Sequence, residues 1–221
     1  ERGQSSKLVY QYLPSRYGMN LDDLRKADAI EVVLGQGAKP GGGGMLLGQK
    51  ITERVAQMRT LPMGVDQRSA CRHPDWTGPD DLEIKIRELR EITNWEKPIY
   101  VKVGATRTRY DVMLAVKAGA DVGGVGGMQG GTAATQDVFI EDVGIPTLPA
   151  VRLAVDALRE AWQHGARVPS EPLRITAQLD VRTPGTDGVW NGHQRVRGEV
   201  RMVGVGRACR ELVFESSDDL A

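Results

Sequence analysis

The chain has 221 residues, enough for one large hydrophobic core or two small domains, and 40% of them are hydrophobic. Its 29 Lys and Arg residues balance its 29 Asp and Glu residues, which argues against nucleic acid or an anionic membrane as a partner. No apolar run approaches the roughly 20 residues of a membrane-spanning helix, and the start lacks a signal peptide's apolar stretch. We therefore expect a cytoplasmic protein. Because Cys71 and Cys209 show no disulfide or zinc spacing, we also expect reduced thiols and no metal.

Strands, loops and helices are expected to alternate along the first two thirds of the chain. Short β-branched or apolar runs predict strands at residues 29–34, 98–103 and 120–122. Glycine-rich stretches predict loops at residues 35–48 and 123–131. Apolar residues at helical spacing predict helices at about 77–94, at 108–119 with Thr108 as the N-cap, and around 151–162.

This repeated order is typical of a parallel sheet with crossover helices, in which functional loops follow the carboxyl ends of the strands. We therefore predict an α/β fold and, as first choice, a TIM (β/α)8-type barrel. A complete barrel takes about 250 residues, more than the alternating region offers, so we expect an incomplete one. After about Gly165 the sequence alternates apolar and polar residues without helical periodicity. We divide the chain into a barrel segment, 1–165, and an atypical β-rich or poorly ordered C-terminal region, 166–221.

The first glycine-rich loop contains two polar side chains suited to an anionic ligand. Gln36 and Lys39 lie among glycines that allow a ligand to approach the backbone closely. A Walker motif is rejected because Gln49 occupies its lysine position, and a dinucleotide fingerprint is rejected because Pro40 replaces its third glycine. The alternative interpretation is a flexible surface loop.

A second glycine-rich loop follows the predicted strand at 120–122. Its backbone amides and hydroxyls could bind phosphate or the edge of a flavin through Gln129, Gly130, Gly131 and Thr132. The alternative is a tight turn that leads into the next helix. Lys102 ends a predicted strand and could point into a barrel mouth, although a solvated strand-end lysine is the alternative.

The segment at residues 71–76 (CRHPDW) gathers reactive residue types, but adjacency in sequence does not place a base beside a thiolate. Arg68 and Arg72 are candidates to clamp a substrate carboxylate, with surface arginines as the alternative.

Residues 35–41 (GQGAKPG) and 127–132 (GMQGGT) resemble the paired signatures of the glutamate synthase FMN-binding (central) domain family. The resemblance extends from about Leu8 to Ala157, and Val101-Lys102-Val103 is similar to the family's flavin-proximal lysine strand. Within the family the chain looks closest to stand-alone glutamate synthase-like subunits, including the large subunit of N-methylglutamate synthase, because residues 45–50 (MLLGQK) follow the glycine run.

The resemblance implies a TIM barrel in which FMN passes electrons to the iminoglutarate formed from 2-oxoglutarate and ammonia, giving L-glutamate. The catalytic and cofactor residues it implies are Lys39, Lys102, Gln129, Gly130, Gly131 and Thr132. It also implies that Gln36 and Lys39 bind substrate, with Arg68 and Arg72 as further candidates. In the N-methylglutamate branch (methylamine–glutamate N-methyltransferase), methylamine is joined to glutamate instead. Glutamine hydrolysis belongs to a separate domain in this family, so amidotransferase or electron-donor subunits are the expected partners.

The sequence differs from the family pattern at several points. Gly42 stands where larger members have an acid, and Gly123 and Gly124 stand where β-branched strand residues are expected. The later Ser-Gly-Gly-Ile-Arg motif and the cysteines of an iron–sulfur cluster are absent after Gly165, so this chain does not support a cluster. We expect a truncated, rearranged or frameshifted C-terminal region, and missing residues before a start that is not Met. A non-catalytic barrel fragment and a phosphate-binding barrel without redox chemistry are the competing hypotheses.

Overall fold

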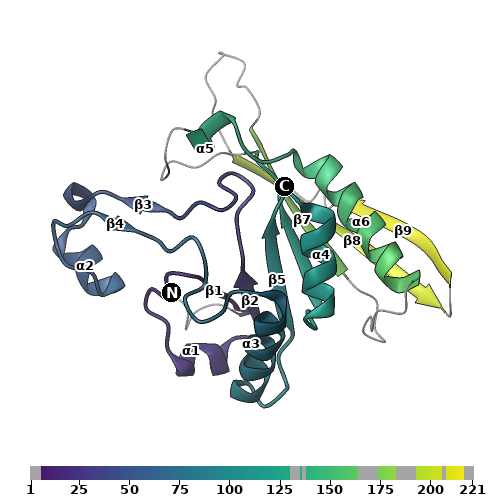
Figure 1. The fold of residues 1–221 in the computed structure, drawn as a ribbon, viewed down its shortest axis with the longest axis horizontal. Helices are drawn as coiled ribbons and strands as arrows, with labels where there is room; N and C mark the ends of the chain where they lie inside the picture. The colour runs from purple at the N-terminus through teal and green to yellow at the C-terminus, as the bar shows by residue number, and fades with distance from the viewer. Residues whose placement is uncertain are drawn as a thin grey trace.

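The computed structural model describes residues 6–129, 135, 138–163, 174–182, 193–205 and 208–216. The main feature is a seven-stranded sheet in the order β1-β2-β5-β6-β7-β8-β9 (Figure 1). Its strands are β1 (Val9–Tyr12), β2 (Ala29–Val33), β5 (Ile99–Gly104), β6 (Val122–Gly126), β7 (Arg174–Arg182), β8 (His193–Val205) and β9 (Ala208–Ser216). A separate two-stranded ribbon pairs β3 (Met45–Leu46) with β4 (Gln67–Arg68). The helices are α1 (Leu21–Lys26), α2 (Glu53–Arg59), α3 (Pro79–Ile92), α4 (Thr108–Lys117), α5 (Val138–Glu141) and α6 (Thr147–Gln163), with a 3-10 turn η2 (Gly48–Lys50).

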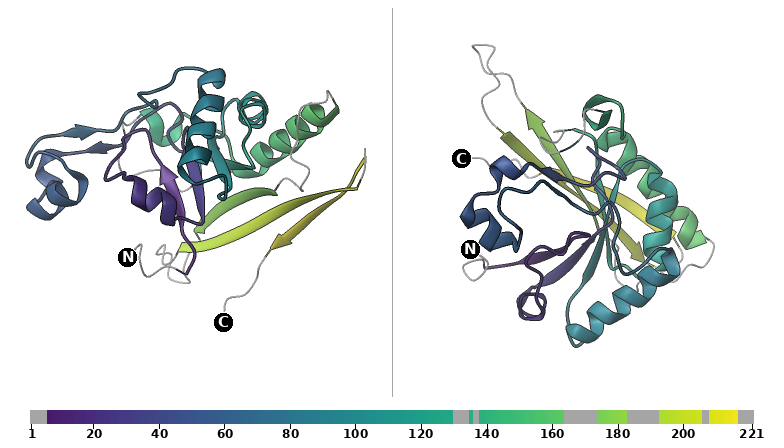
Figure 2. Two further views of the ribbon diagram at one scale, coloured as in Figure 1. Left: turned by 90° about the horizontal axis from the view of Figure 1, so that it is seen from below. Right: turned by 60° about the vertical axis from the view of Figure 1, so that its left-hand side comes forward.

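The strands from β1 to β7 run parallel to their neighbours in the sheet, and β8 and β9 follow antiparallel. Their order follows the chain without reversal, and Figure 2 shows α3, α4 and α6 on the same side of the sheet. This single direction of winding is the connectivity of a barrel segment. The α/β class and the parallel sheet are thus confirmed. The described strands form an open sheet with β1 and β9 at its edges, and a closed barrel stays a prediction.

Most predicted elements are confirmed, with three corrections. The loop predicted at residues 35–48 is wrong near its end, where Met45–Leu46 form β3 by pairing with β4. The loop predicted from residue 123 is wrong at its start, because β6 continues to Gly126 between β5 and β7, which pair with its backbone on both sides. The predicted N-cap at Thr108 is also wrong. Arg107 is the cap residue, and Thr108 begins the helix with its side chain 1% exposed.

The described residues of the C-terminal region form strands β7, β8 and β9, which agrees with one of the two alternatives predicted for it. β7 pairs with β6, so the sheet crosses the proposed boundary at residue 165, and the division into two regions stays a prediction. Within the described part of the chain, no helix is both long and apolar enough to span a membrane.

The core lies between the sheet and its covering helices. On β5, Val101 and Val103 are buried in this core, while Tyr100 and Lys102 alternate with them and are half-buried. Because successive strand residues point to opposite faces, Lys102 lies on the face away from the helices. The strand that builds the core therefore also presents a cation on the open face.

The loops that follow β2, β5 and β6 meet backbone to backbone at the carboxyl end of the sheet. Ala105 N donates to Gly126 O at 2.8 Å, and Ile145 N donates to Ala105 O at 3.0 Å. A Cβ added at Gly37 would lie 2.0 Å from Gly126 O and 2.2 Å from Gly127 O. Residue 37 must therefore be glycine for the first loop to reach this position.

Replacing two glycines of this region by alanine, Gly37 and Gly123, is predicted to change the free energy of unfolding in opposite directions. Gly37→Ala should lower the free energy of unfolding by about 1–3 kcal/mol or more, because the methyl group overlaps two carbonyls. Gly123→Ala in β6 should raise it by about 0.5–1 kcal/mol, because none of the described atoms lies within 4 Å of the added Cβ and alanine costs less conformational entropy. Urea unfolding of both variants measures the difference, and equal effects would contradict it.

Candidate functional site

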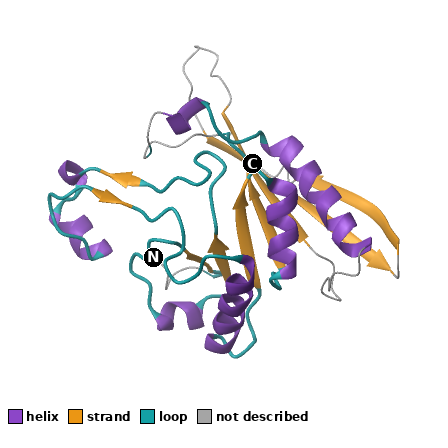
Figure 3. Cartoon of the chain, viewed as in Figure 1, coloured by secondary structure: helices purple, strands orange, loops and turns teal. Residues whose placement is uncertain are grey.

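A cavity of about 840 Å³ opens at the carboxyl end of β2. One wall is the end of β2 with the first glycine-rich loop, and a second wall is the loop between β1 and α1. Residues 69–71 and helix α2 complete it. Helix α2 belongs to the arm, residues 45–68, which carries the β3–β4 ribbon and extends from one edge of the main sheet (Figure 3). Functional loops are expected at this end of a parallel sheet.

Two of the predicted substrate residues line this cavity. Lys39 and Gln36 both come from the first glycine-rich loop. The Lys39 side chain is 9% exposed, and burial lowers the pKa of its ammonium group. A cation held in a partly desolvated wall attracts a carboxylate more strongly than one in open water.

Lys102 lies beside the cavity, on the open face of the sheet. A Cβ added at Gly124 would lie 3.4 Å from the Lys102 Cβ, so the aliphatic chain of Lys102 runs past β6. A Cβ at Gly126 would meet both Lys102 Cε, at 3.8 Å, and Gly37 N, at 3.4 Å. The end of Lys102 is therefore close to the root of the first glycine-rich loop. The ammonium group of Lys102 makes no hydrogen bond or ion pair with the residues that the structure describes.

Of the predicted cofactor residues in the second loop, only Gln129 lies within the described residues. Its Oε1 accepts hydrogen bonds from Thr147 N and Thr147 Oγ1, both at 3.0 Å. Gln129 thus caps the start of α6, a structural role that the sequence analysis did not anticipate. Gly130, Gly131 and Thr132 lie outside the described residues, and their roles stay predictions.

The two arginines predicted to clamp a carboxylate do not lie with Lys39. Arg68 is an exposed residue of β4. Arg72 lines a second cavity, of about 390 Å³, on the helix side of the sheet. The first glycine-rich loop separates the two cavities: Lys39 and Gly42 line the larger one, and Pro40 and Gly41 line the smaller one.

Arg54 and Arg59 of α2 line the larger cavity instead. The Arg59 guanidinium lies 5.8 Å from the centre of the Tyr17 ring, across from the arm. These two arginines were not predicted from the sequence. Helix α2 is short and has no buried side chain, so its sequence shows no apolar periodicity. Its one local signal is Thr52, which accepts a hydrogen bond from Val55 N as the N-cap.

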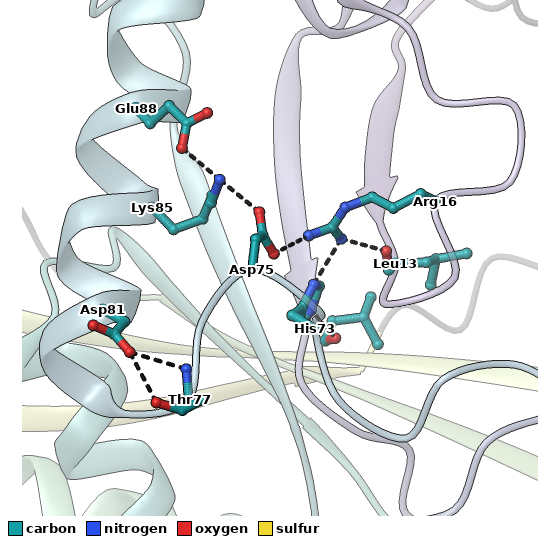
Figure 4. A network of polar contacts seen from close by, with 9 residues as sticks. Leu13, Arg16, His73, Asp75, Thr77, Asp81, Lys85 and Glu88 are labelled. Carbon is teal, nitrogen blue, oxygen red and sulfur yellow. Dashed lines mark hydrogen bonds and ion pairs between the residues drawn. The ribbon is translucent and has the colours of Figure 1, made fainter.

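A partly buried polar network holds the segment at residues 71–77 (Figure 4). Arg16 donates to His73 Nδ1 at 2.7 Å and to Asp75 Oδ1 at 2.5 Å. Because a guanidinium can only donate, His73 Nδ1 must accept, and the proton sits on Nε2, which donates to Val33 O at 2.8 Å. Both ring nitrogens are therefore occupied, and His73 does not serve as a base for Cys71.

The charges of this network compensate one another. Lys85 bridges Asp75, at 2.7 Å, and Glu88. Burial alone would raise the pKa of Asp75, but the hydrogen bond from Lys85 and the charge of Arg16 outweigh it and lower that pKa. Burial, together with the positive charges of Arg16 and Lys85, lowers the pKa of His73 from 6.5 to about 4, against the hydrogen bond to Val33 and the charge of Asp75. The neutral ring stacks on Trp76 at 3.8 Å between ring centres.

The neutral state of His73 predicts a pH-dependent stability. Between pH 6.5 and about 4 the unfolded chain protonates this ring and the native protein does not, so the free energy of unfolding falls as the pH falls. The full difference is worth about 3 kcal/mol. Urea unfolding of wild type and His73→Gln at about pH 7 and about pH 4.5 should show a smaller pH effect in the variant. Equal pH effects in the two proteins would contradict this assignment.

Comparison with known proteins identifies relatives over most of the chain. Residues 1–176 match the family described as the conserved region in glutamate synthase. A glutamate synthase large subunit-like protein of Rhizobium meliloti is 77% identical over 164 residues, which are 74% of this chain and 37% of that protein. An archaeal glutamate synthase [NADPH] of Methanocaldococcus jannaschii is 38% identical over 189 residues, which are 84% of this chain and 37% of that protein.

The glutamate synthase [NADPH] large chain of Azospirillum brasilense is 34% identical over 140 residues, which are 62% of this chain and 9% of that protein. The chain thus spans between about a tenth and somewhat over a third of the length of these curated relatives. The match to the conserved region covers the whole sheet from β1 to β6, the larger cavity, and the described residues at the carboxyl end of the strands. The chain belongs to the glutamate synthase family.

Proposed function

We propose that this chain forms part of an FMN-dependent glutamate synthase-type oxidoreductase that converts 2-oxoglutarate to L-glutamate through 2-iminoglutarate. The observation that carries the proposal is the position of Lys102. Its side chain lies half-buried over the glycines of β6, without a partner among the described residues, beside a cavity that contains the buried Lys39. The names of the relatives, glutamate synthases, support the same reaction class.

The open face of β6 suits a flat cofactor. Gly124 and Gly126 present no side chain there, which leaves the backbone and Lys102 to contact a ring system. When bound, FMN would supply the hydride that reduces the imine carbon. The Lys102 ammonium would favour negative charge on the reduced ring, and Gln129, Gly130, Gly131 and Thr132 are proposed to hold the cofactor from the second loop.

The larger cavity suits a small dicarboxylate. 2-Oxoglutarate carries two negative charges, and the cavity wall contains three cations, Lys39, Arg54 and Arg59, against one carboxylate, Asp23, together with the amide of Gln36. Arginine side chains bind carboxylates in a fixed bidentate geometry. Because burial lowers the pKa of Lys39, its ammonium releases a proton more readily, and we assign it the proton that the product nitrogen gains while carbon receives the hydride. Arg68 and Arg72 do not line this cavity, and we retain them only as further candidates to bind a substrate carboxylate.

Ammonia and electrons must reach this site from elsewhere. We propose amidotransferase or electron-donor subunits as partners, in agreement with relatives named large subunit-like and large chain.

Flavin binding is the first test of this function. FMN added to the purified chain should show saturable changes in absorbance and fluorescence, and Lys102→Ala should weaken binding at least tenfold because the charge beside the ring is lost. Lys117→Ala, on the exposed side of α4, is the matched control and should bind as wild type. A folded wild-type chain that does not bind FMN would favour the non-catalytic fragment instead.

A second test concerns the substrate cavity. In calorimetric titrations 2-oxoglutarate should bind at least tenfold more weakly to Lys39→Met than to wild type, a loss of about 1.4 kcal/mol. The control is Lys50→Met, which removes an exposed lysine of η2 outside the cavity. Equal affinities in the two variants would remove Lys39 from the substrate site.

A further inference from the structure

Arg16 adopts a backbone conformation that is unusual for its residue type. Its φ is 55°, in the left-handed region that side-chain-bearing residues rarely enter, at a cost of about 1–2 kcal/mol. The turn is closed by Arg16 N donating to Leu13 O and Met19 N donating to Arg16 O, both at 3.2 Å. Such a conformation persists where the surrounding contacts fix it.

The guanidinium of Arg16 ties two distant chain segments together. One nitrogen donates to Leu13 O at 2.5 Å and to His73 Nδ1 at 2.7 Å, and the other donates to Asp75 at 2.5 Å. The same group lies 3.9 Å from the centre of the Tyr12 ring. The side chain is 18% exposed, so water competes little for these donors.

Two of the contacts of Arg16, those with Leu13 and His73, lead to walls of the larger cavity. Leu13 lines the cavity from the loop between β1 and α1. His73 passes the connection on to Val33, which lines the cavity at the end of β2. Cys71, two residues before His73, lines it from the third side. Arg16 itself does not line the cavity, so it acts on a bound ligand only through these neighbours.

We propose that Arg16 is a positioning residue whose guanidinium fixes three walls of the larger cavity relative to one another and thereby sets the affinity of that cavity for its dicarboxylate ligand. The identity of the ligand rests on the proposed function. The Arg16 clamp, which consists of the hydrogen bonds from its guanidinium to Leu13, His73 and Asp75, does not depend on that function.

Arginine is required at this position because one group must donate in three directions. Lysine keeps the positive charge that, together with Lys85, balances the negative charges of Asp75 and Glu88. Its ammonium group cannot reproduce the planar arrangement of N–H donors of a guanidinium. Arg16→Lys therefore tests geometry at constant charge. Arg90 offers a matched control: its side chain is 17% exposed, and it joins α3 to Asp121 and Gly119 away from the cavity.

The experiment compares Arg16→Lys and Arg90→Lys with wild type in two measurements. Titration with 2-oxoglutarate should show at least tenfold weaker binding for Arg16→Lys and an unchanged affinity for Arg90→Lys, although both variants lose stability. FMN affinity should stay within twofold of wild type in both. Hydrogen–deuterium exchange should rise at least tenfold in residues 13–19 and 69–77 together in Arg16→Lys only. Arg16→Ala should show the same losses, and added ethylguanidinium should restore its affinity for 2-oxoglutarate and the slow exchange of the two segments.

The outcomes separate the clamp from the proposed function. If the wild-type protein does not bind 2-oxoglutarate, the proposed ligand is wrong. The hydrogen–deuterium exchange of residues 13–19 and 69–77 would still show whether Arg16 holds these two segments together. Exchange and affinity that are unchanged in folded Arg16→Lys, or equally changed in Arg90→Lys, would overturn the role of Arg16.

Discussion

The close approach of backbones at the carboxyl end of the sheet is the constraint on which the rest of the structure depends. The first glycine-rich loop touches the end of β6 at Gly37, where no side chain fits, and Ala105 bonds to both Gly126 and residue 145. This contact brings Lys39 to the cavity and the end of Lys102 to the root of the same loop. One cation of the first glycine-rich loop and one cation of β5 therefore lie at the same edge of the sheet, where the backbone between them carries no side chains.

The second organising feature is the network around His73. The neutral His73 ring stacks on Trp76, accepts a hydrogen bond from Arg16 and donates one to the backbone, while two carboxylates compensate Arg16 and Lys85. Buried charges are tolerated in proteins when each has a partner of this kind. The network connects β1, β2, α3 and the segment that follows the arm, and it meets the wall of the larger cavity at Leu13 and Val33.

Much of the fold was predictable because its signals are local. The buried run at 29–34 and the helical spacing in α3 each fix an element without reference to distant residues. The glycines of β6 gave the opposite local signal, and the strand forms because neighbouring strands satisfy its backbone. The sequence could not predict that Arg54 and Arg59 line the same cavity as Lys39. Helix α2 of the arm has no buried side chain and therefore leaves no periodic pattern in the sequence. Lys39, Gln36 and Lys102 were predicted from family resemblance combined with the position of strand ends, and their roles stay predictions; Lys39 and Gln36 line the larger cavity.

The glycine-rich loop between the two cavities has a consequence for redesign of the protein. Leu34 and Gly35 line both cavities, and the next residues of the loop face one or the other. A rigid displacement of this loop that enlarges one cavity narrows the other. An engineered variant that is meant to accept a bulkier molecule on the Lys39 side would therefore need compensating small side chains around Pro40, on the far side of the loop.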